Sequence, residues 1–216
     1  MSMTQGFTTV DARMLDTPAA YRLLTGVVVP RPVAWITTVD AAGVVNAAPF
    51  SSYNYVCHSP PMLAVNIGSR AGRLKDTARN LTEGREFVVN VSTVANLEAM
   101  HRSSAEYAPD QSETTALGLE LWPSIHVRPP RIALAPVQME CRLEHVLQLG
   151  PLNTLYIGEV LAFHLSNEIY DGRQVDTAKM QPVARLGGPY YAALGQIFER
   201  PMLATPPLPT QPGGLT

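Results

Sequence analysis

Residues 33–48 read VAWITTVDAAGVVNAA, and this stretch decides the fold. A β-branched run from Val33 to Val39 is followed by the turn-forming residues Asp40-Ala41-Ala42-Gly43 and then by a second apolar run from Val44 to Ala48. Two such runs joined by a short glycine-containing loop are typical of a β-hairpin. We therefore predict a hairpin over residues 33–48.

On either side of the hairpin, short apolar runs are separated by breakers such as Pro30-Arg31-Pro32, Pro60-Pro61 and Gly84. These runs predict strands at residues 23–30, 53–56, 62–67, 87–91, 137–149 and 155–165. Short helices are predicted at 77–83, with Asp76 as N-cap and Gly84 as the stop, and at 94–100, whereas the polar residues 103–118 predict a surface excursion. Many short strands without regular strand–helix alternation favour an antiparallel β-barrel, closed or split, over a doubly wound sheet.

The composition is that of a single globular domain. The chain has 216 residues, of which 46% are hydrophobic and 16% charged, and this excludes intrinsic disorder for its bulk. A net charge of −2 differs from the basic character of most nucleic-acid-binding proteins, so no nucleic-acid partner is expected. We expect one domain over residues 1–200. Residues 201–216 contain five prolines and two glycines and are expected to form a flexible tail, or an arm that becomes ordered on a partner.

Neither the cysteines nor the N-terminus suggests a secreted or membrane protein. Cys57 and Cys141 form no CxxC pattern, so neither a disulfide framework nor a cysteine zinc site is expected. Residues 1–11 lack the basic flank and apolar stretch of a secretion signal, and no apolar run is long enough to span a membrane. We therefore expect a soluble, cytoplasmic protein.

Several familiar catalytic motifs are missing. The five histidines are scattered without metal-site spacing. Gly68-Ser69-Arg70-Ala71-Gly72 is not a nucleophile elbow, because Ile67 stands where that motif requires glycine. No strand is followed by the GxGxxG pattern of dinucleotide-binding folds. We predict no metal site and no catalytic side chain.

An unusual concentration of cations and hydroxyl groups lies at residues 69–77, SRAGRLKDT. Lysine occurs only at Lys75 and Lys179, and Lys75 directly precedes the predicted helix. A helix N-terminus offers free N–H groups and a positive dipole end, and neighbouring cations add charge-assisted hydrogen bonds, so the segment suits a phosphate. The alternative is a solvated basic turn before an ordinary helix.

A second polar segment, residues 46–54 (NAAPFSSYN), leaves the hairpin and enters a loop. Its small residues would let a flat polar ring approach the backbone, with amide and hydroxyl groups available to bind it. The alternative is a serine-rich connection without a ligand. Together the two segments suggest one extended ligand, with a ring at one end and a phosphate at the other.

The sequence resembles the flavin reductase-like family of FMN-binding split barrels over residues 20–201. The motifs that carry the resemblance are Pro30-Arg31-Pro32-Val33-Ala34-Trp35, Asn46-Ala47-Ala48-Pro49-Phe50-Ser51, Pro60-Pro61, Lys75-Asp76-Thr77 with Asn80, Gly158-Glu159-Val160, and Arg185-Leu186-Gly187-Gly188 with Tyr190. The resemblance implies a mainly β, six-stranded antiparallel Greek-key split β-barrel with a few short helices. It also implies a homodimer with one FMN per subunit near the interface.

The resemblance further implies which residues contact the cofactor. Those near the flavin ring would be Asn46, Ala47, Ser51 and Ser52, and those near the phosphate would be Ser69, Arg70, Lys75, Asp76 and Thr77. Asn153 and its neighbour Thr154 occupy a loop position that touches flavin in relatives, some of which carry His where Asn153 stands. Thr37, on the first hairpin strand, is a further candidate.

The implied reaction is hydride transfer from NADH or NADPH to flavin, with reduced flavin or its electrons passed to a partner such as a monooxygenase. Because the cofactor carries this chemistry, no acid–base pair is required. Two alternatives remain open: an electron-transfer flavoprotein of the flavoredoxin type, which uses an electron-acceptor protein, and a flavin-binding module without activity. His126 is a candidate for orienting nicotinamide, and the alternative is a surface or interface histidine. Trp35 is expected to pack in the barrel or at an interface.

Overall fold

The computed structural model describes residues 6–69, 72–108 and 111–201. The predicted tail at 201–216 therefore lies outside the described residues except for Pro201.

The predicted hairpin is confirmed and consists of β2 (Ala34–Val39) and β3 (Val45–Phe50), paired antiparallel. The Asp40 side chain closes the turn by accepting hydrogen bonds from the backbone N–H groups of Ala42 and Val44, at 2.9 and 2.8 Å. Gly43 has φ +87°, a conformation that residues with a Cβ rarely adopt. The turn chemistry in the sequence therefore forms the turn in the structure.

The hairpin belongs to a seven-stranded antiparallel sheet in the order β3-β2-β6-β9-β10-β5-β4. Its other strands are β4 (Tyr53–His58), β5 (Pro61–Gly68), β6 (Glu86–Val91), β9 (Val137–Leu149) and β10 (Asn153–Leu165). The two edge strands, β3 and β4, are separated along the chain only by Ser51 and Ser52, and the N–H of Asn66 in β5 bonds to the Ser52 carbonyl at 2.8 Å. The sheet must therefore curl until its edges meet, as the predicted antiparallel barrel requires, with one strand more than the six expected.

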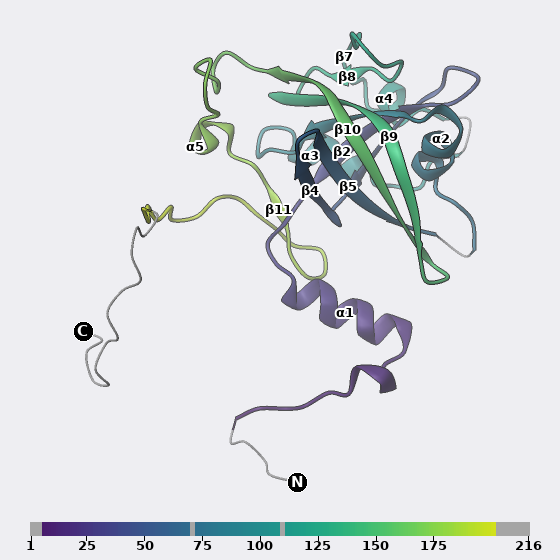
Figure 1. Ribbon diagram of the computed structural model, residues 1–216, viewed down its shortest axis with the longest axis vertical. Coiled ribbons are helices and arrows are strands. Elements are labelled where there is room, and N and C mark those ends of the chain that lie inside the picture. Colours follow the sequence, from purple (N-terminus) through teal and green to yellow (C-terminus); the bar gives the residue numbers. More distant parts are fainter. Residues whose placement is uncertain (1–5, 70–71, 109–110, 202–216) are drawn as a thin grey trace.

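Shorter elements surround this barrel (Figure 1). A small sheet contains β1 (Arg31–Pro32), β11 (Ala184–Arg185) and β12 (Tyr191–Ala192), and β7 (Leu121–Trp122) pairs with β8 (Arg131–Ile132). The helices are η1 (Ala12–Met14), α1 (Thr17–Val27), α2 (Asp76–Gly84), α3 (Leu97–Arg102), α4 (Glu113–Ala116) and α5 (Thr177–Met180).

Strand β2 is buried on both faces because it separates two hydrophobic clusters. Ala34 and Ile36 belong to the barrel core, whereas Trp35 belongs to a second cluster that includes Met100 and Ile132. The Trp35 indole N–H donates to the Ser103 hydroxyl at 2.9 Å, so its polar atom is satisfied. Trp35 is thus buried, but on the face of β2 that points away from the barrel core, against Met100 of α3 and Ile132 of β8.

The strand predicted at 23–30 is wrong, because most of that segment belongs to helix α1 (Thr17–Val27). The Asp16 carboxylate accepts the N–H of Ala19 at 2.7 Å, and Pro18 occupies the first turn. An N-cap followed by proline favours a helix start, and this signal precedes the β-branched residues, which lie at the helix end. Figure 1 shows α1 extending away from the barrel, and none of its residues is buried.

The other predicted helices shift by a few residues. Helix α2 begins at Asp76, with Lys75 at the N-cap position and no side-chain cap, so Asp76 is not the N-cap. The left-handed residue that ends α2 is Arg85, at φ 57°, and not Gly84. Helix α3 begins at Leu97, three residues later than predicted, because the Asn96 side chain accepts the N–H of Thr93 in a turn.

The predicted surface excursion at 103–118 is only partly exposed. It contains the short helix α4, in which Glu113 and Thr114 are buried. The Glu113 carboxylate accepts the N–H of Ala47 in β3 at 2.9 Å. This contact ties the segment to the hairpin.

Candidate functional site

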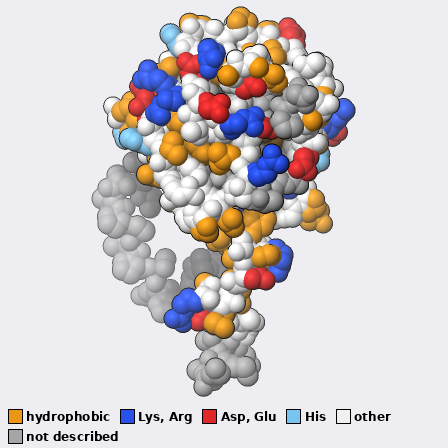
Figure 2. Space-filling model, turned by 90° about the vertical axis from the view of Figure 1, so that its right-hand side faces the viewer, with side chains coloured by type: hydrophobic (Ala, Val, Ile, Leu, Met, Phe, Trp, Pro, Cys, Tyr) orange, Lys and Arg blue, Asp and Glu red, His pale blue; other side chains and the backbone are white. Residues whose placement is uncertain are grey.

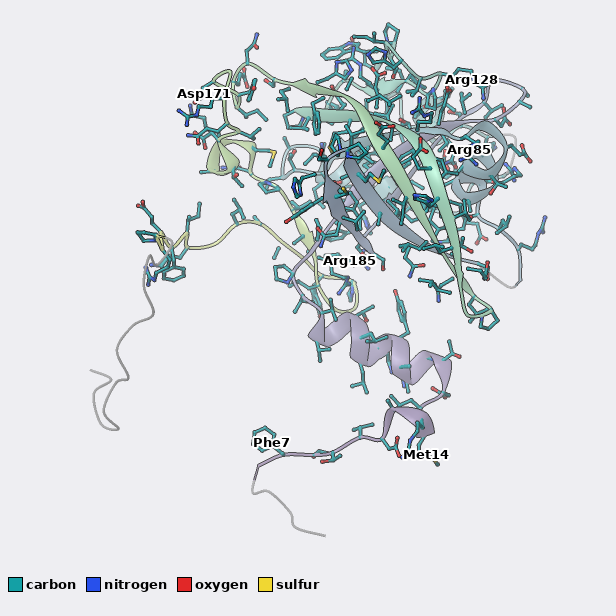
Figure 3. The ribbon with its side chains drawn as sticks, viewed as in Figure 1. Phe7, Met14, Arg85, Arg128, Asp171 and Arg185 are labelled. Atoms are coloured by element: carbon teal, nitrogen blue, oxygen red, sulfur yellow. The ribbon has the colours of Figure 1, made fainter. Side chains whose placement is uncertain are left out.

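A cavity of about 490 Å³ lies where the two edges of the barrel meet, a size typical of small-molecule sites. It is bounded by the end of β3, the Ser51–Ser52 link, β5, the start of β10, helix α1 and the β1–β11 pair. Arg185 lines this cavity, and Figure 3 shows it between the barrel and the end of α1 that lies nearest the barrel. Its described lining residues are Tyr21, Thr25, Arg31, Pro49, Phe50, Ser51, Ser52, Asn66, Gly68, Ser69, Lys75, Asn153, Arg185, Leu186 and Gly188.

Backbone geometry brings β5 and β10 together at the cavity wall. Gly68 pairs with Asn153, and a Cβ at Gly68 would lie 3.2 Å from the Asn153 Oδ1 atom. The N–H of Ser69 bonds to the Leu152 carbonyl at 2.7 Å, which fixes the chain as it leaves β5. Glycine at position 68 therefore allows the Asn153 amide to lie against the strand.

Two lining residues carry buried polar atoms without partners. Asn66 Oδ1 and Ser69 Oγ make no hydrogen bond within the described residues. Leaving a buried donor or acceptor unpaired costs about 1–3 kcal/mol. A ligand with hydrogen-bonding groups at these two positions would remove that cost.

The described lining residues carry positive charge and no carboxylate. Arg31, Lys75 and Arg185 line the cavity, and no Asp or Glu is among the described residues that do so. The Lys75 Nζ atom lies 5.5 Å from the centre of the Phe50 ring, and this cation–π contact holds it at the wall. The cavity is therefore suited to an anionic ligand.

Of the predicted contact residues, Ser51, Ser52, Ser69, Lys75 and Asn153 line this one cavity. The two polar segments singled out in the sequence thus meet in the structure. Arg70 lies outside the described residues.

The remaining predicted residues bond within the protein. The hydroxyl of Thr37 donates to the Pro130 carbonyl at 2.6 Å, and the hydroxyl of Thr154 donates to the Gln148 side chain at 2.9 Å. The N–H of Ala47 is held by Glu113, and Asp76 pairs with Arg79 at 2.6 Å. None of these four lies among the lining residues of the cavity.

Asn46 and Thr77 connect the hairpin to helix α2. The Asn46 amide donates to the Thr77 hydroxyl at 2.8 Å, and the Asn80 amide, one turn further along α2, donates to the Thr38 hydroxyl at 3.1 Å. All four side chains are buried. These bonds fix the N-terminus of α2, and with it Lys75, relative to the barrel.

Several lining residues of the cavity were not predicted from the sequence. Asn66 had a local signal, because it is a polar residue in an otherwise apolar strand. Arg31 and Arg185 were noted only as parts of motifs, and their juxtaposition depends on strands far apart in sequence. Tyr21 and Thr25 lie on helix α1, which was not predicted, so neither residue was expected at the cavity.

A buried carboxylate, that of Glu140, is held by a group of hydrogen bonds outside the cavity. This carboxylate accepts the backbone N–H groups of Ile125 and His126 at 2.7 and 2.6 Å and contacts the Nε2 atom of His164 at 2.6 Å. Burial alone would raise the pKa of Glu140, but these hydrogen bonds outweigh it and hold the pKa below its usual value. His126 thus serves through its backbone, and its side chain does not line the cavity.

Neither a metal site nor a membrane-spanning helix is found in the described ranges. Among residues 6–69, 72–108 and 111–201, no group of three or more His, Cys, Asp or Glu side chains is placed to hold a metal ion. Within the same ranges, every helix is too short or too polar to cross a bilayer.

Known proteins match this chain over most of its length. A model of the flavin reductase like domain matches residues 26–179. The Bacillus subtilis (strain 168) protein YwrF is 41% identical over 195 residues, which cover 87% of this chain and 95% of that protein.

Two solved structures are similar in both fold and sequence. Nitrilotriacetate monooxygenase component B from Bacillus cereus superposes with a TM-score of 0.88 at 35% identity, covering 91% of this chain and 100% of that chain. The Pseudomonas fluorescens 2-nitrobenzoate 2-nitroreductase NbaA gives 0.85 at 31% identity, with coverage of 93% and 98%. The chain, with its split-barrel fold, belongs to the flavin reductase-like family.

Proposed function

We propose that the cavity binds FMN and that the protein reduces this flavin with NADH or NADPH. The observation that carries the proposal is the convergence of Ser51, Ser52, Ser69, Lys75 and Asn153 on one cavity. Its positive charge suits a phosphate, and the Asn66 and Ser69 oxygens, which have no partner among the described residues, suit a polar ligand. The residues present therefore fit the cofactor.

The role of the chain in this reaction is placement. Bound flavin supplies the hydride acceptor, so no side chain has to act as nucleophile or base. Lys75 and Ser69 would hold the phosphate, while Ser51, Ser52 and Asn66 would orient the polar edge of the ring. Fixing two reactants in a near-attack geometry can lower a barrier by about 7–11 kcal/mol.

The test is a comparison of two flavins in a lysine variant. Lys75→Ala is expected to weaken FMN about tenfold or more and to leave riboflavin, which has no phosphate, nearly unchanged. Flavin fluorescence quenching measures both dissociation constants. The matched control is Lys179→Ala, which removes the other lysine, an exposed residue near Asp176. Equal losses for both flavins would reject the phosphate assignment.

The hydride donor is tested separately by mixing the flavin-loaded protein with NADH or NADPH under anaerobic stopped flow. Bleaching of the flavin absorbance by either nucleotide supports reductase activity. Protein that binds flavin but is bleached by neither would favour the alternative of an electron-transfer protein or an inactive flavin-binding module. The similarity to a monooxygenase component B favours a partner that uses the reduced flavin.

We further propose that the protein is a homodimer, as its resemblance implies. Helix α1 exposes Leu23, Leu24 and Val27, and the segment near the C-terminal end of the described chain exposes Ile197 and Phe198. Figure 2 shows the narrow projection below the rounded body, with hydrophobic side chains where the two meet. Exposed apolar surfaces of this kind mark interaction sites, and we propose that a second copy of the chain covers the apolar side chains of α1.

A further inference from the structure

The cavity contains two arginines that lie directly opposite each other on paired strands. Arg31 of β1 and Arg185 of β11 are register partners, and both line the cavity. Side chains directly opposite on antiparallel strands point to the same face with Cβ atoms about 5 Å apart, and like charges placed there repel. An anion between or beside the two guanidinium groups would relieve this repulsion.

No carboxylate of the described residues supplies that anion. Arg31 donates to three backbone carbonyls, those of Thr25, Val28 and Leu186, at 2.7, 2.7 and 3.0 Å. Arg185 donates twice to the Gly188 carbonyl, at 3.2 and 2.7 Å, and once to the Tyr191 hydroxyl, at 2.6 Å. Neutral acceptors fix both guanidinium groups in place without cancelling their charge.

Toward the residues that the structure describes, each guanidinium also keeps unused donors. An arginine has five N–H groups, and three are used by each of Arg31 and Arg185. Stacking on the Tyr191 ring, 4.6 Å from its centre, holds Arg185 further. The two residues thus present fixed, half-buried donors on the cavity wall, as oxyanion binding requires.

We propose that Arg31 and Arg185 form a second anion subsite, distinct from the phosphate locus at Ser69 and Lys75, which binds an oxyanion of the ligand that reacts with the flavin. The inference rests on the proposed function, because it assigns a reaction partner to the same cavity. Two small molecules carry the required chemistry: the pyrophosphate of a nicotinamide dinucleotide, and the carboxylate of an aromatic acid reduced on the flavin. The subsite selects for the oxyanion in either case.

The experiment uses flavin-loaded Arg185→Gln protein, with Arg185→Lys as the conservative variant and Arg173→Gln as the control. Arg173 is exposed and lies outside the cavity. One arm compares flavin reduction by NADH with reduction by N-benzyl-1,4-dihydronicotinamide, a neutral hydride donor. The other compares benzoate with benzamide, followed through the flavin absorbance. FMN and riboflavin affinities are measured in every variant.

In Arg185→Gln, the affinity for the anionic ligand of at least one arm is expected to fall about tenfold or more. The affinity for its neutral counterpart, and the ratio of FMN to riboflavin affinity, should stay within about twofold of the wild-type values. Arg185→Lys should recover part of the loss, and Arg173→Gln should behave as wild type. The arm that responds identifies the source of the anion.

Equal behaviour of anionic and neutral ligands in both arms, with flavin binding intact, would overturn the second subsite alone. A selective loss of FMN over riboflavin in Arg185→Gln would also overturn it, because the arginines would then serve the flavin phosphate. Failure of the wild type to bind either flavin would instead overturn the proposed function on which the inference rests. If Arg185→Gln does not fold, measurements on the wild type still test the subsite. The subsite requires one of two results: benzoate binds at least about tenfold more tightly than benzamide, or pyrophosphate competes with NADH but not with the neutral donor. The absence of both results in the wild type would overturn the subsite.

Discussion

Two buried glutamates show how local hydrogen bonding decides the effect of a charge. Glu140 and Glu113 are both removed from solvent. Glu140 accepts two backbone N–H groups and contacts His164, and its pKa lies below the usual value. Burial raises the pKa of Glu113. The hydrogen bond from the N–H of Ala47 offsets only part of this increase, and the charge of nearby Asp76 adds to it. The ionised form is thus favoured at Glu140 and disfavoured at Glu113.

Glu140→Gln is predicted to lower the free energy of unfolding at pH 7 by about 1–3 kcal/mol, because an amide cannot accept from all three donors. A carboxyl whose folded-state pKa is depressed stabilises the fold fully above its unfolded pKa, near 4.3. That contribution is lost as the pH falls through the lower folded-state value. The difference between wild type and variant, measured by urea denaturation, should therefore shrink below about pH 4.3.

Glu113→Gln is the matched control, because the pKa of Glu113 is shifted in the opposite direction to that of Glu140. A carboxyl whose folded-state pKa is raised costs stability as the pH rises through its folded-state value. An uncharged amide avoids that cost and can still accept the N–H of Ala47. The variant should be as stable as wild type at pH 7 or more stable, so an equal loss in both variants would contradict the assignment.

Individual site residues could be predicted from the sequence where the neighbouring residues in the chain are themselves unusual. Lys75, Ser51 and Ser52 stood out because each belongs to a short segment of unusual composition. Arg31 and Arg185 are brought together only by strand pairing across 154 positions of sequence, in the register Arg31↔Arg185. Composition and spacing carry no information on such a pair.

At the scale of elements, Gly158 of β10 leaves room for the side chain of Phe87, which extends from β6 across the intervening strand β9. A Cβ at Gly158 of β10 would lie 2.5 Å from a ring carbon of Phe87 in β6, in the buried core. Gly158→Ala is predicted to destabilise the protein by about 1–3 kcal/mol, because the ring must leave its position. The midpoint and slope of a urea unfolding curve measure this loss.

A double-mutant cycle attributes that loss to the ring. Phe87→Leu removes part of the clash, so adding Gly158→Ala to Phe87→Leu should cost less than it does in the wild type, with a coupling of about 0.5–3 kcal/mol. Strictly additive losses would show that Phe87 is not the obstacle.

Helices and strands could be predicted where residues close together in the chain determine them. The hairpin at 33–48 has its turn residues between two apolar runs, and strand β9 (Val137–Leu149) coincides with the predicted range. Helix α1 was missed because its signal, Asp16 with Pro18, lies before the β-branched residues that suggested a strand. Closure of the sheet could be expected only in general terms, because it depends on pairings among distant strands.

At the scale of the whole molecule, the cavity is a consequence of closing the sheet. Ser51 and Ser52 must bridge the two edge strands, so the backbone there cannot continue a regular ladder on both sides. The same region receives the end of β5, the start of β10 and the β1–β11 pair with helix α1. Polar groups not used by sheet pairing therefore gather at this one place, and a ligand can use them.

Helix α1 extends away from the barrel and has no buried residue. An isolated helix of 11 residues is marginal in water, and its exposed apolar side chains include Leu24, 61% exposed, and Val27, 72% exposed. If a second copy covers this face, Leu24→Glu should convert the dimer into a monomer, because a buried unpaired carboxylate is costly. Arg22→Glu, on the same helix, places a carboxylate at a position that is already charged and should leave the dimer intact. Multi-angle light scattering gives the mass of each form, and a wild type that elutes at the mass of one 23.4 kDa chain would refute the homodimer.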